Sequence, residues 1–356
     1  MKKIAIIVNQ YHPFIGGTES LAKSLVEKIL CNFYEIEIIT NPNLSRNKQN
    51  YNYKINEINL SDENGLNTII KDNKYDCCIF FADLHSAHLN IYNLTCNKNI
   101  CILNIDERTY SVRNAFPKAI NNLKKFTKVI SYTKDGVANR FLRENNINYV
   151  YIQNFSRDIL LTEPNPIFEE KIKGLFENQD RKLILYLAAM EERKNQHYVI
   201  TKLVEQSHLR EFNWLFVGPQ NNIAYTTKCI EEIKKYNLPV KFVKGFDDVD
   251  KLNTLYQISD LVCLTSIAEG MPLVLLEGLS ANKPWVSTPV GGVPSSLNDT
   301  NTGVILSKVD FSGVELYDSL KQALKITNNN PRDLWSSFYR EDLVLEKYKN
   351  LIREII

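Results

Sequence analysis

Two glutamates in one short segment give the most specific chemical signal in this sequence. Glu269 and Glu277, with seven residues between them, lie in the run SIAEGMPLVLLEGLSAN (266–282). Pro272 is favourable in the first turn of a helix, and Gly270 allows a ligand to approach the backbone at that turn. Free N–H groups at a helix start bind a diphosphate, and a carboxylate accepts hydrogen bonds from both hydroxyls of a diol. The pattern therefore predicts a diphosphate at the helix start, with one carboxylate on sugar hydroxyls and the other on a ribose.

The alternative is that Glu277 is an ordinary exposed residue of this helix. The preceding residues, 273–276, are Leu, Val, Leu and Leu, which predicts a helix that is buried over most of its surface. A carboxylate in such a run is rarely buried without a partner. This argument favours a functional role for Glu277.

The elements that would position these glutamates alternate between strands and helices. Lys3–Val8 is a continuous apolar run typical of a parallel strand covered on both faces. A loop containing Pro and Gly (11–17) and a helix (18–30) follow it, which is typical of the opening of a doubly wound domain. Further strands are expected at 34–40, 77–81, 100–105, 129–131 and 149–152, and helices at 115–126 and 135–145. The polar segment 41–59 is expected to form a loop or a short edge strand.

A second alternating series occupies the rest of the chain. Strands are expected at 182–188, 214–217, 240–243, 261–264 and 284–287, and helices at 195–206, 226–236, 251–258 and 272–281. Two such series predict an α/β fold with two Rossmann-like, doubly wound parallel-sheet domains facing across a cleft. Ligands bind beyond the carboxyl ends of parallel strands, so the site is expected in the loops that follow them. We expect domains at 1–157 and 158–333, with a linker at 156–165 that holds two prolines, and an amphipathic helix at 334–356.

The composition is that of a folded soluble protein. Hydrophobic residues make up 44% and charged residues 24% of the 356, which excludes a disordered chain and a collagen-like repeat. The formal charge of +2 argues against a nucleic-acid partner, although residues 1–157 carry +6 and the remainder −4. Seven cysteines without a CxxC pair predict reduced thiols in a cytoplasmic protein. No apolar run is long enough to span a membrane.

Five segments resemble family 4 of the retaining GT-B glycosyltransferases, which transfer sugars from nucleotide-sugars. They are YHPFIGGTE (11–19), YIQNF (151–155), ERKNQ (192–196), YQISDLVCLTSIAEGMPLVLLEGLSANKPWVSTPVGGVP (256–294) and NTGVIL (301–306). The fourth segment contains both glutamates and is the most specific of the five. The resemblance spans nearly the whole chain. It implies transfer of a sugar to a glycan or lipid-linked acceptor in surface polysaccharide biosynthesis, with a UDP-sugar favoured over a GDP-sugar as donor.

The resemblance also implies a role for each residue that matches the family pattern. Glu277 would hold the donor ribose, Glu269 would lie beside the donor sugar and diphosphate, and Lys194 would stabilise the leaving diphosphate. Donor contacts through the backbone are expected from Gly16, Gly17, Gly270, Met271, Pro272 and Leu273. The final helix, 334–356, would cross back onto the N-terminal, acceptor-binding domain. Attack is expected on the face from which the diphosphate departs, without a covalent intermediate.

Two departures from the family pattern affect these roles. A glycine–arginine pair often precedes the lysine in the family, whereas this chain has Ala188 and Ala189. Arg193 either replaces that arginine or is a solvated residue at a helix start. The family's histidine near the end of strand 100–105 is also missing, and Asp106 is expected there as a base or an acceptor of sugar hydroxyls, or otherwise as a helix cap.

Three histidines are expected near the acceptor. His12 lies in the loop after the first strand, and His85 and His88 follow strand 77–81. Their positions at carboxyl ends of strands place them where a ligand binds in this fold class. Metal binding by His85 and His88 alone is improbable, because two ligands are too few.

Four lysines accompany an expected amphipathic helix at 115–126. They are Lys118, Lys124, Lys125 and Lys128. The resemblance implies that this helix either contacts an anionic membrane peripherally, at the inner face of the plasma membrane, or is an ordinary solvated helix.

No metal or other cofactor is expected. Lysine, arginine and a helix start can neutralise the diphosphate leaving group, and no convincing Asp-x-Asp metal pair is present. Asp247, Asp248 and Asp250 precede a helix and are expected to cap it. An alternative to the enzyme is a degenerate GT-B partner subunit that binds a glycan or a protein. Ala189 and the missing histidine motivate that alternative.

Overall fold

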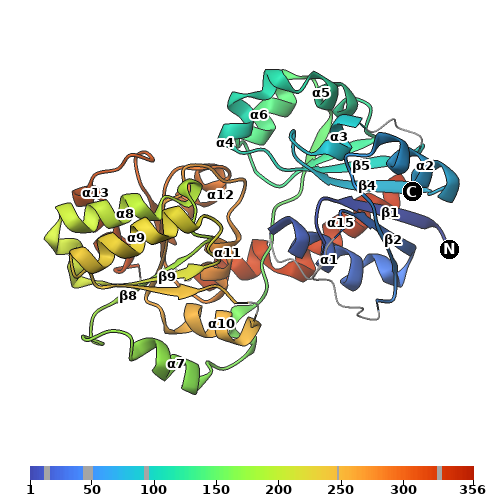
Figure 1. Cartoon of the computed structure of the whole chain (residues 1–356). Helices are drawn as coiled ribbons and strands as arrows, with labels where there is room; N and C mark the ends of the chain where they lie inside the picture. The colour runs from blue at the N-terminus through green and yellow to red at the C-terminus, as the bar shows by residue number, and fades with distance from the viewer. Residues whose placement is uncertain (12–16, 43–50, 92–95, 247, 327–330) are drawn as a thin grey trace. The chain divides into compact units, whose positions relative to one another are not determined.

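The computed structural model divides the chain into two compact units. The first comprises Met1–Asn154 with Asp342–Ile356, and the second comprises Phe155–Glu341. The structure describes residues 1–11, 17–42, 51–91, 96–246, 248–326 and 331–356. Each unit is built on one parallel sheet (Figure 1).

The first unit contains a seven-stranded sheet in the order β3-β2-β1-β4-β5-β6-β7. Every strand pair in it is parallel. Its strands are β1 (Lys3–Val8), β2 (Glu35–Thr40), β3 (Lys54–Glu57), β4 (Cys77–Ala82), β5 (Asn99–Leu103), β6 (Lys128–Ser131) and β7 (Tyr149–Tyr151). The central strands β1, β4 and β5 are almost entirely buried because helices cover both faces of the sheet.

The helices of the first unit lie on both sides of this sheet. They are α1 (Gly17–Lys28), α2 (Glu63–Asn73), α3 (Ala87–Ile91), α4 (Glu107–Ser111), α5 (Pro117–Leu123), α6 (Val137–Glu144) and α15 (Glu341–Ile355). Apolar residues of α2, α3, α5 and α6 share one core with the strands. Figure 1 shows α1 and α15 on the opposite side of the sheet.

The second unit contains a six-stranded parallel sheet in the order β10-β9-β8-β11-β12-β13. Its strands are β8 (Leu183–Leu187), β9 (Asn213–Gly218), β10 (Val240–Lys244), β11 (Leu261–Leu264), β12 (Trp285–Ser287) and β13 (Gly303–Ile305). Its helices are α7 (Pro166–Lys173), α8 (Gln196–Glu205), α9 (Ile223–Lys235), α10 (Val249–Ile258), α11 (Leu273–Ser280), α12 (Val293–Leu297), α13 (Gly313–Ala323) and α14 (Pro331–Leu334). In Figure 1, α8 and α9 lie on one side of the strands and α10 on the other.

At the carboxyl edge of the second sheet, two neighbouring strand ends lie so close together that one position must be glycine. A Cβ on Gly218, the last residue of β9, would collide with the carbonyl oxygen of Ala188 just after β8. The neighbouring loops are joined there by hydrogen bonds from Met190 N to Pro219 O (2.8 Å) and from Gly245 N to Gly218 O (2.8 Å). Only glycine permits this approach at position 218.

The α/β fold with two Rossmann-like parallel sheets is confirmed. Most predicted strands differ from the observed ones by one or two residues. The uncertain segment 41–59 contributes the edge strand β3, and Asp248 caps α10, as expected, by accepting from Lys251 N (3.1 Å). Residues 303–305, part of the NTGVIL motif, form the additional strand β13. That the two domains face each other across a cleft stays a prediction.

Two expected segments differ from the structure. The segment 156–165 is packed into the second unit, because Ile159 is buried and Asp158 pairs with Arg332 (2.5 Å). The segment 334–356 is not one helix: a π-helix, Trp335–Tyr339, precedes α15, and Arg340 between them is extended. The chain departs from helical geometry there because Tyr339 accepts a backbone hydrogen bond from Ser156 (3.2 Å).

All seven cysteines are free thiols, and all except Cys31 are buried. The expectation of reduced cysteines that pack as small apolar residues agrees with this. In the described parts of the chain, no helix has both the length and the apolar character needed to cross a membrane.

Candidate functional site

The strongest candidate site lies in two loops at the carboxyl edge of the second sheet. One loop follows β8 and contains a short 3-10 helix, η4 (Glu192–Lys194). The other follows β11 and contains Glu269 and Gly270 before α11 begins. Because β8 and β11 are adjacent parallel strands, their carboxyl ends place these loops side by side. This is the edge at which parallel α/β sheets bind ligands.

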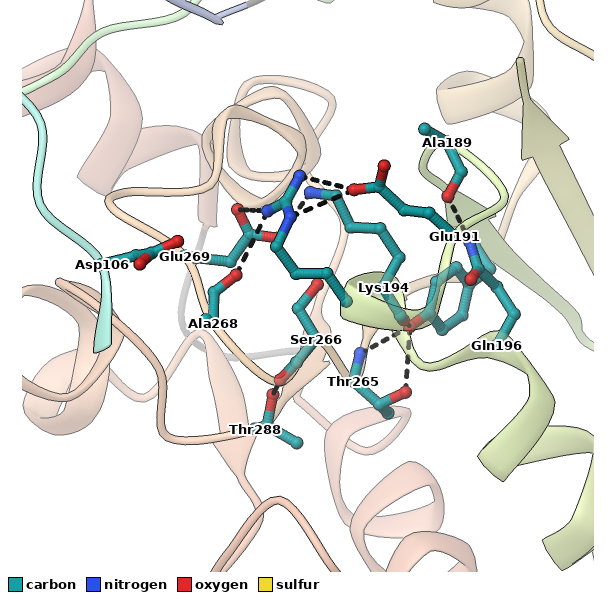
Figure 2. Close-up of polar contacts among 12 residues, drawn as sticks. Asp106, Ala189, Glu191, Lys194, Gln196, Thr265, Ser266, Ala268, Glu269 and Thr288 are labelled. Carbon is teal, nitrogen blue, oxygen red and sulfur yellow. Dashed lines mark hydrogen bonds and ion pairs between the residues drawn. The ribbon is translucent and has the colours of Figure 1, made fainter. Parts of the chain in front are cut away.

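Glu269 is held by two cations from the loop after β8 (Figure 2). Lys194 Nζ lies 2.5 Å from Glu269 Oε1, and Arg193 Nη1 lies 3.2 Å from Oε2. Arg193 Nη2 also lies 2.8 Å from Glu191 Oε1. The carboxylate of Glu269 is only 9% exposed, and burial of a charge requires such partners. The cluster of Glu191, Arg193, Lys194 and Glu269 contains two positive and two negative charges.

A buried phenol fixes the spacing of the two loops. Tyr186 of β8 donates its hydroxyl hydrogen to the carbonyl oxygen of Lys194 and accepts from Thr265 N (2.9 Å). A further backbone hydrogen bond joins Ile267 N to Arg193 O (2.8 Å). Burial raises the pKa of Tyr186 well above its usual value, so the phenol stays protonated and can donate.

The turn before α11 depends on close contacts between Gly270 and the glycines Gly291 and Gly292. Gly292 N donates to the carbonyl oxygen of Gly270 (2.7 Å). Gly291 has φ +54°, and a Cβ there would collide with the same carbonyl group, so only glycine suits this position. Met271 and Pro272 are buried, and α11 starts at Leu273. In the described structure no side chain caps α11, which leaves its N-terminus available to an anion.

Glu277 lies one turn into α11 and has different partners. Tyr256 of α10 donates its hydroxyl to Glu277 Oε2 (2.5 Å). Arg157 Nε lies 3.4 Å from Glu277 Oε1. Burial, followed by the charge of Glu277, raises the pKa of Tyr256 well above its usual value. The side chain of Glu277 remains 18% exposed, so a ligand can still reach it.

Asp106 lies in the first unit, where it caps α4. Its Oδ1 accepts from Thr109 N (2.8 Å) and Thr109 Oγ1 (3.0 Å), and its Oδ2 pairs with Arg108 Nη2 (3.0 Å). Burial alone would raise the pKa of Asp106, but these hydrogen bonds and the charge of Arg108 lower it below its usual value. A carboxyl with a lowered pKa is a weaker proton acceptor.

Asp106 and His85 line the same cavity of about 430 Å³ at the carboxyl edge of the first sheet. The cavity is lined by Asp83, His85, Asn104, Asp106, Arg108, Thr109, Ser111 and Val112. Its polar lining suits a hydroxylated ligand. His88 is not part of it: the ring is fully buried, and its Nε2 lies 3.1 Å from Phe81 O. Burial lowers the pKa of His88 to about 4, so it is a neutral core residue that no ligand reaches here.

The remaining expected residues lie as follows. Gly17 is the first residue of α1 and is exposed, whereas His12 and Gly16 lie outside the described residues. Ala189, the position of the missing arginine, is partly exposed, and its carbonyl oxygen accepts from Gln196 Nε2 (2.7 Å). Among the described residues, no cluster of three His, Cys, Asp or Glu side chains could hold a metal ion. Independence of metal stays a prediction.

Sequence reasoning missed four residues that contact the predicted ones. Glu191 could have been predicted from the sequence, because a carboxylate two residues before an arginine is a simple charge pattern. The other three could not have been predicted in this way. Tyr186 and Tyr256 lie in apolar runs that are typical of a protein core, and Arg157 lies far from Glu277 in the sequence. Their contacts link residues between 8 and 120 positions apart.

Comparisons with known proteins found similar sequences and similar folds. Residues 167–333, just under half of the chain, match a family model described as "Glycosyl transferases group 1". A curated relative, N-acetyl-alpha-D-glucosaminyl L-malate synthase of Bacillus anthracis, is 28% identical over 161 residues. That alignment covers 44% of this chain, which spans about a third (34%) of the length of the synthase.

Solved structures match over the whole chain. Sucrose-phosphate synthase from Thermosynechococcus elongatus has a TM-score of 0.80 at 14% identity, with 99% of each chain covered. HepE of Anabaena, solved in complex with UDP-glucose, has a TM-score of 0.77 at 15% identity, with 99% of this chain and 100% of HepE covered. At these identities the likeness shows the fold alone. The fold of this chain is that of the GT-B glycosyltransferases, and its second unit contains the segment that matches the group 1 glycosyl transferase model.

Proposed function

We propose that this protein is a glycosyltransferase that moves a sugar from a nucleoside-diphosphate sugar to a hydroxyl-bearing acceptor. One observation carries the proposal: Arg193 and Lys194 converge on Glu269 beside the uncapped start of α11. Two cations and a helix N-terminus in one place form a site for a diphosphate. This site lies within the segment that matches the group 1 glycosyl transferase model.

The chemistry that these residues would perform is charge stabilisation. When the bond between the anomeric carbon and the diphosphate oxygen breaks, the nucleoside diphosphate takes the electron pair and gains negative charge. Lys194 and Arg193, which are both partly buried, would stabilise that charge. Glu269 would hold both cations in position until the donor binds and would then contact the donor sugar. Glu277 would accept hydrogen bonds from the ribose.

The finer features of the proposal are the donor, the stereochemistry and the acceptor. We propose a UDP-sugar donor, in the manner of the family 4 enzymes, with retention at the anomeric carbon and no metal. The name of the Bacillus anthracis relative supports sugar transfer, and the UDP-glucose complex of HepE supports the donor class. The proposed acceptor is a glycan or a lipid-linked saccharide of surface polysaccharide biosynthesis. It would bind in the first unit near Asp106 and His85.

We further propose that the enzyme works in the cytoplasm, peripherally at the inner face of the plasma membrane. Lys118, Lys124 and Lys125 are exposed on and just after α5, whereas Leu123 is buried in the core. The apolar side of α5 is thus used by the fold, and attraction to anionic lipid would be electrostatic. Binding to vesicles of 30% phosphatidylserine that disappears in 0.5 M salt would test it.

The function is tested by incubating the purified protein with UDP-, GDP- and ADP-sugars and measuring the release of nucleoside diphosphate. We expect release from one donor class, at a rate that Lys194→Ala lowers about 100-fold or more. Lys202→Ala, which removes a lysine paired with Glu205 on α8, is the matched control. The absence of release from all these donors would contradict the proposal.

A second candidate function follows from Ala189. Because the family arginine is missing, the chain would be a catalytically degenerate partner subunit that binds a glycan or a protein. Nucleotide affinity distinguishes the two functions. An enzyme should lose affinity for the nucleoside diphosphate in Glu277→Ala, whereas equal affinity in the wild type and this variant favours the partner subunit.

A further inference from the structure

The contacts of Glu277 carry an inference about how a nucleotide is selected. Tyr256 donates to Oε2 at 2.5 Å, and Arg157 Nε lies 3.4 Å from Oε1. Tyr256 makes a hydrogen bond to one oxygen of the carboxylate, and the positive charge of Arg157 lies beside the other. Because an ionised carboxylate offers about four acceptor positions, each oxygen keeps one for a ligand.

Arg157 is fixed in place by its neighbours along the chain. Ser156 accepts from Trp335 Nε1 (2.9 Å), and Asp158 is held by both terminal nitrogens of Arg332 (2.5 and 2.7 Å). Ile159 N donates to the hydroxyl of Ser280, the last residue of α11 (2.8 Å). The backbone on both sides of Arg157 is therefore anchored, on its C-terminal side to the helix that contains Glu277.

Tyr256 is fixed equally well. It is fully buried in α10, and its raised pKa keeps the phenol protonated. A protonated phenol donates its hydrogen to the carboxylate, and this hydrogen bond holds Oε2 in one position. The two partners thus come from different parts of the second unit and act on the two oxygens of one group.

We propose that Tyr256 and Arg157 are positioning residues that orient Glu277 to accept both hydroxyls of a ribose, so that the site selects ribonucleotides over 2′-deoxyribonucleotides. This inference rests on the proposed function, because it needs a nucleotide donor at α11. Arg157 lies outside the segment 167–333 that matches the family model. Selectivity for the ribose therefore depends on a residue before the matched segment.

The geometry explains why both partners are needed. A carboxylate held at one oxygen can rotate about its last bond, and a rotated group meets only one hydroxyl at good geometry. Hydrogen bonds to a charged group are among the strongest in proteins. Loss of one hydrogen bond between a ribose hydroxyl and Glu277 lowers the affinity for the nucleotide by about 10-fold to 100-fold. The loss is larger for the ribose form, because a 2′-deoxyribose offers Glu277 only its 3′-hydroxyl.

The test compares the affinity of UDP with that of 2′-deoxy-UDP by calorimetry, and repeats the comparison with the guanine and adenine pairs. We expect the wild type to prefer the ribose form of its nucleotide by at least about tenfold. In Tyr256→Phe and in Arg157→Gln the preference should fall to about threefold or less, because the ribose form weakens more than the deoxyribose form. Arg157→Lys should recover part of it, because the positive charge is kept.

Matched controls separate positioning from general destabilisation. Tyr198→Phe removes another phenol hydrogen bond of the second unit, to Phe311 O (2.9 Å), and Arg210→Gln removes an arginine bound to Leu203 O (2.9 Å). Both controls should keep the wild-type preference. If Tyr256→Phe does not fold, the two substitutions of Arg157, which is 30% exposed, carry the test.

The outcomes distinguish this inference from the proposed function. Equal weakening of the ribose and deoxyribose forms in the variants would overturn the inference and leave the glycosyltransferase intact. A wild type that binds nucleotides without a preference for ribose would do the same. A wild type that binds none of the nucleoside diphosphates would overturn both.

Discussion

Glu269 and Asp106, the two carboxylates expected to act in catalysis, are held by partners at very different distances along the chain. The cations on Glu269 come from residues 75 and 76 positions earlier in the sequence. The partners of Asp106 are Arg108 and Thr109, two and three positions later. A helix cap and an ion pair with the neighbouring Arg108 account for these contacts of Asp106, whereas those of Glu269 join two loops far apart in the sequence.

This difference is the reason why we propose that Glu269, and not Asp106, belongs to a dedicated site. A buried ion pair contributes little net stability, because desolvation offsets the attraction between the charges. Stability therefore does not explain why this ion pair lies at the edge of the sheet. The proposed diphosphate site does explain it. A capping aspartate, in contrast, stabilises its own helix wherever that helix lies.

The largest effect is expected from Lys194→Ala. Removal of this cation leaves the leaving diphosphate without its nearest positive charge, and we expect the rate of nucleoside diphosphate release to fall about 100-fold or more. Thermal stability should change little, because Arg193 still pairs with Glu269. A rate within threefold of the wild type would mean that the cluster is structural.

Glu269→Gln should lower both activity and stability. The isosteric amide leaves Lys194 and Arg193 partly buried without a countercharge, which we expect to cost about 2 kcal/mol in the free energy of unfolding. Release of nucleoside diphosphate should fall about tenfold. Urea denaturation measures the first effect. Glu205→Gln, at an exposed pair with Lys202, is the control and should cost less than about 0.5 kcal/mol.

The sequence predicts more of the fold than of the site. The strands of both sheets are readable because they are continuous apolar runs between turn residues, as in Lys3–Val8. Glu269 and Glu277 were predicted from their spacing in the motif, and Lys194 was predicted from the family resemblance. Contacts made across the fold were not identified, because Tyr186 and Tyr256 look like ordinary core tyrosines in a linear sequence.

Tyr186→Phe tests whether the loop spacing matters. The substitution keeps the ring but leaves Lys194 O and Thr265 N without this partner, so the cations are held less rigidly toward the donor. We expect kcat to fall about fivefold to tenfold with a smaller change in KM. Tyr198→Phe should leave kcat unchanged. Equal losses in both variants would point to general destabilisation instead of positioning.

Asp106 gives the smallest expected effect and the sharpest contrast with Glu269. Asp106→Ala should cost about 1 kcal/mol at pH 7, because the first turn of α4 loses its cap. The pKa of Asp106 is lowered in the folded state, so the charged cap stabilises the fold at neutral pH. That contribution is lost as the pH falls below about 4. Urea denaturation at pH 7 and pH 3 should therefore show a smaller difference between the variant and the wild type at the lower pH.

Asp106→Asn separates capping from chemistry, because asparagine caps a helix as well as aspartate does but cannot accept a proton. If Asp106 is only a cap, this variant should keep both its stability and its rate of sugar transfer. A tenfold loss of rate at unchanged stability would instead give Asp106 a chemical role. In that case local hydrogen bonds would no longer distinguish a structural carboxylate from a catalytic one, and the contrast with Glu269 would fail.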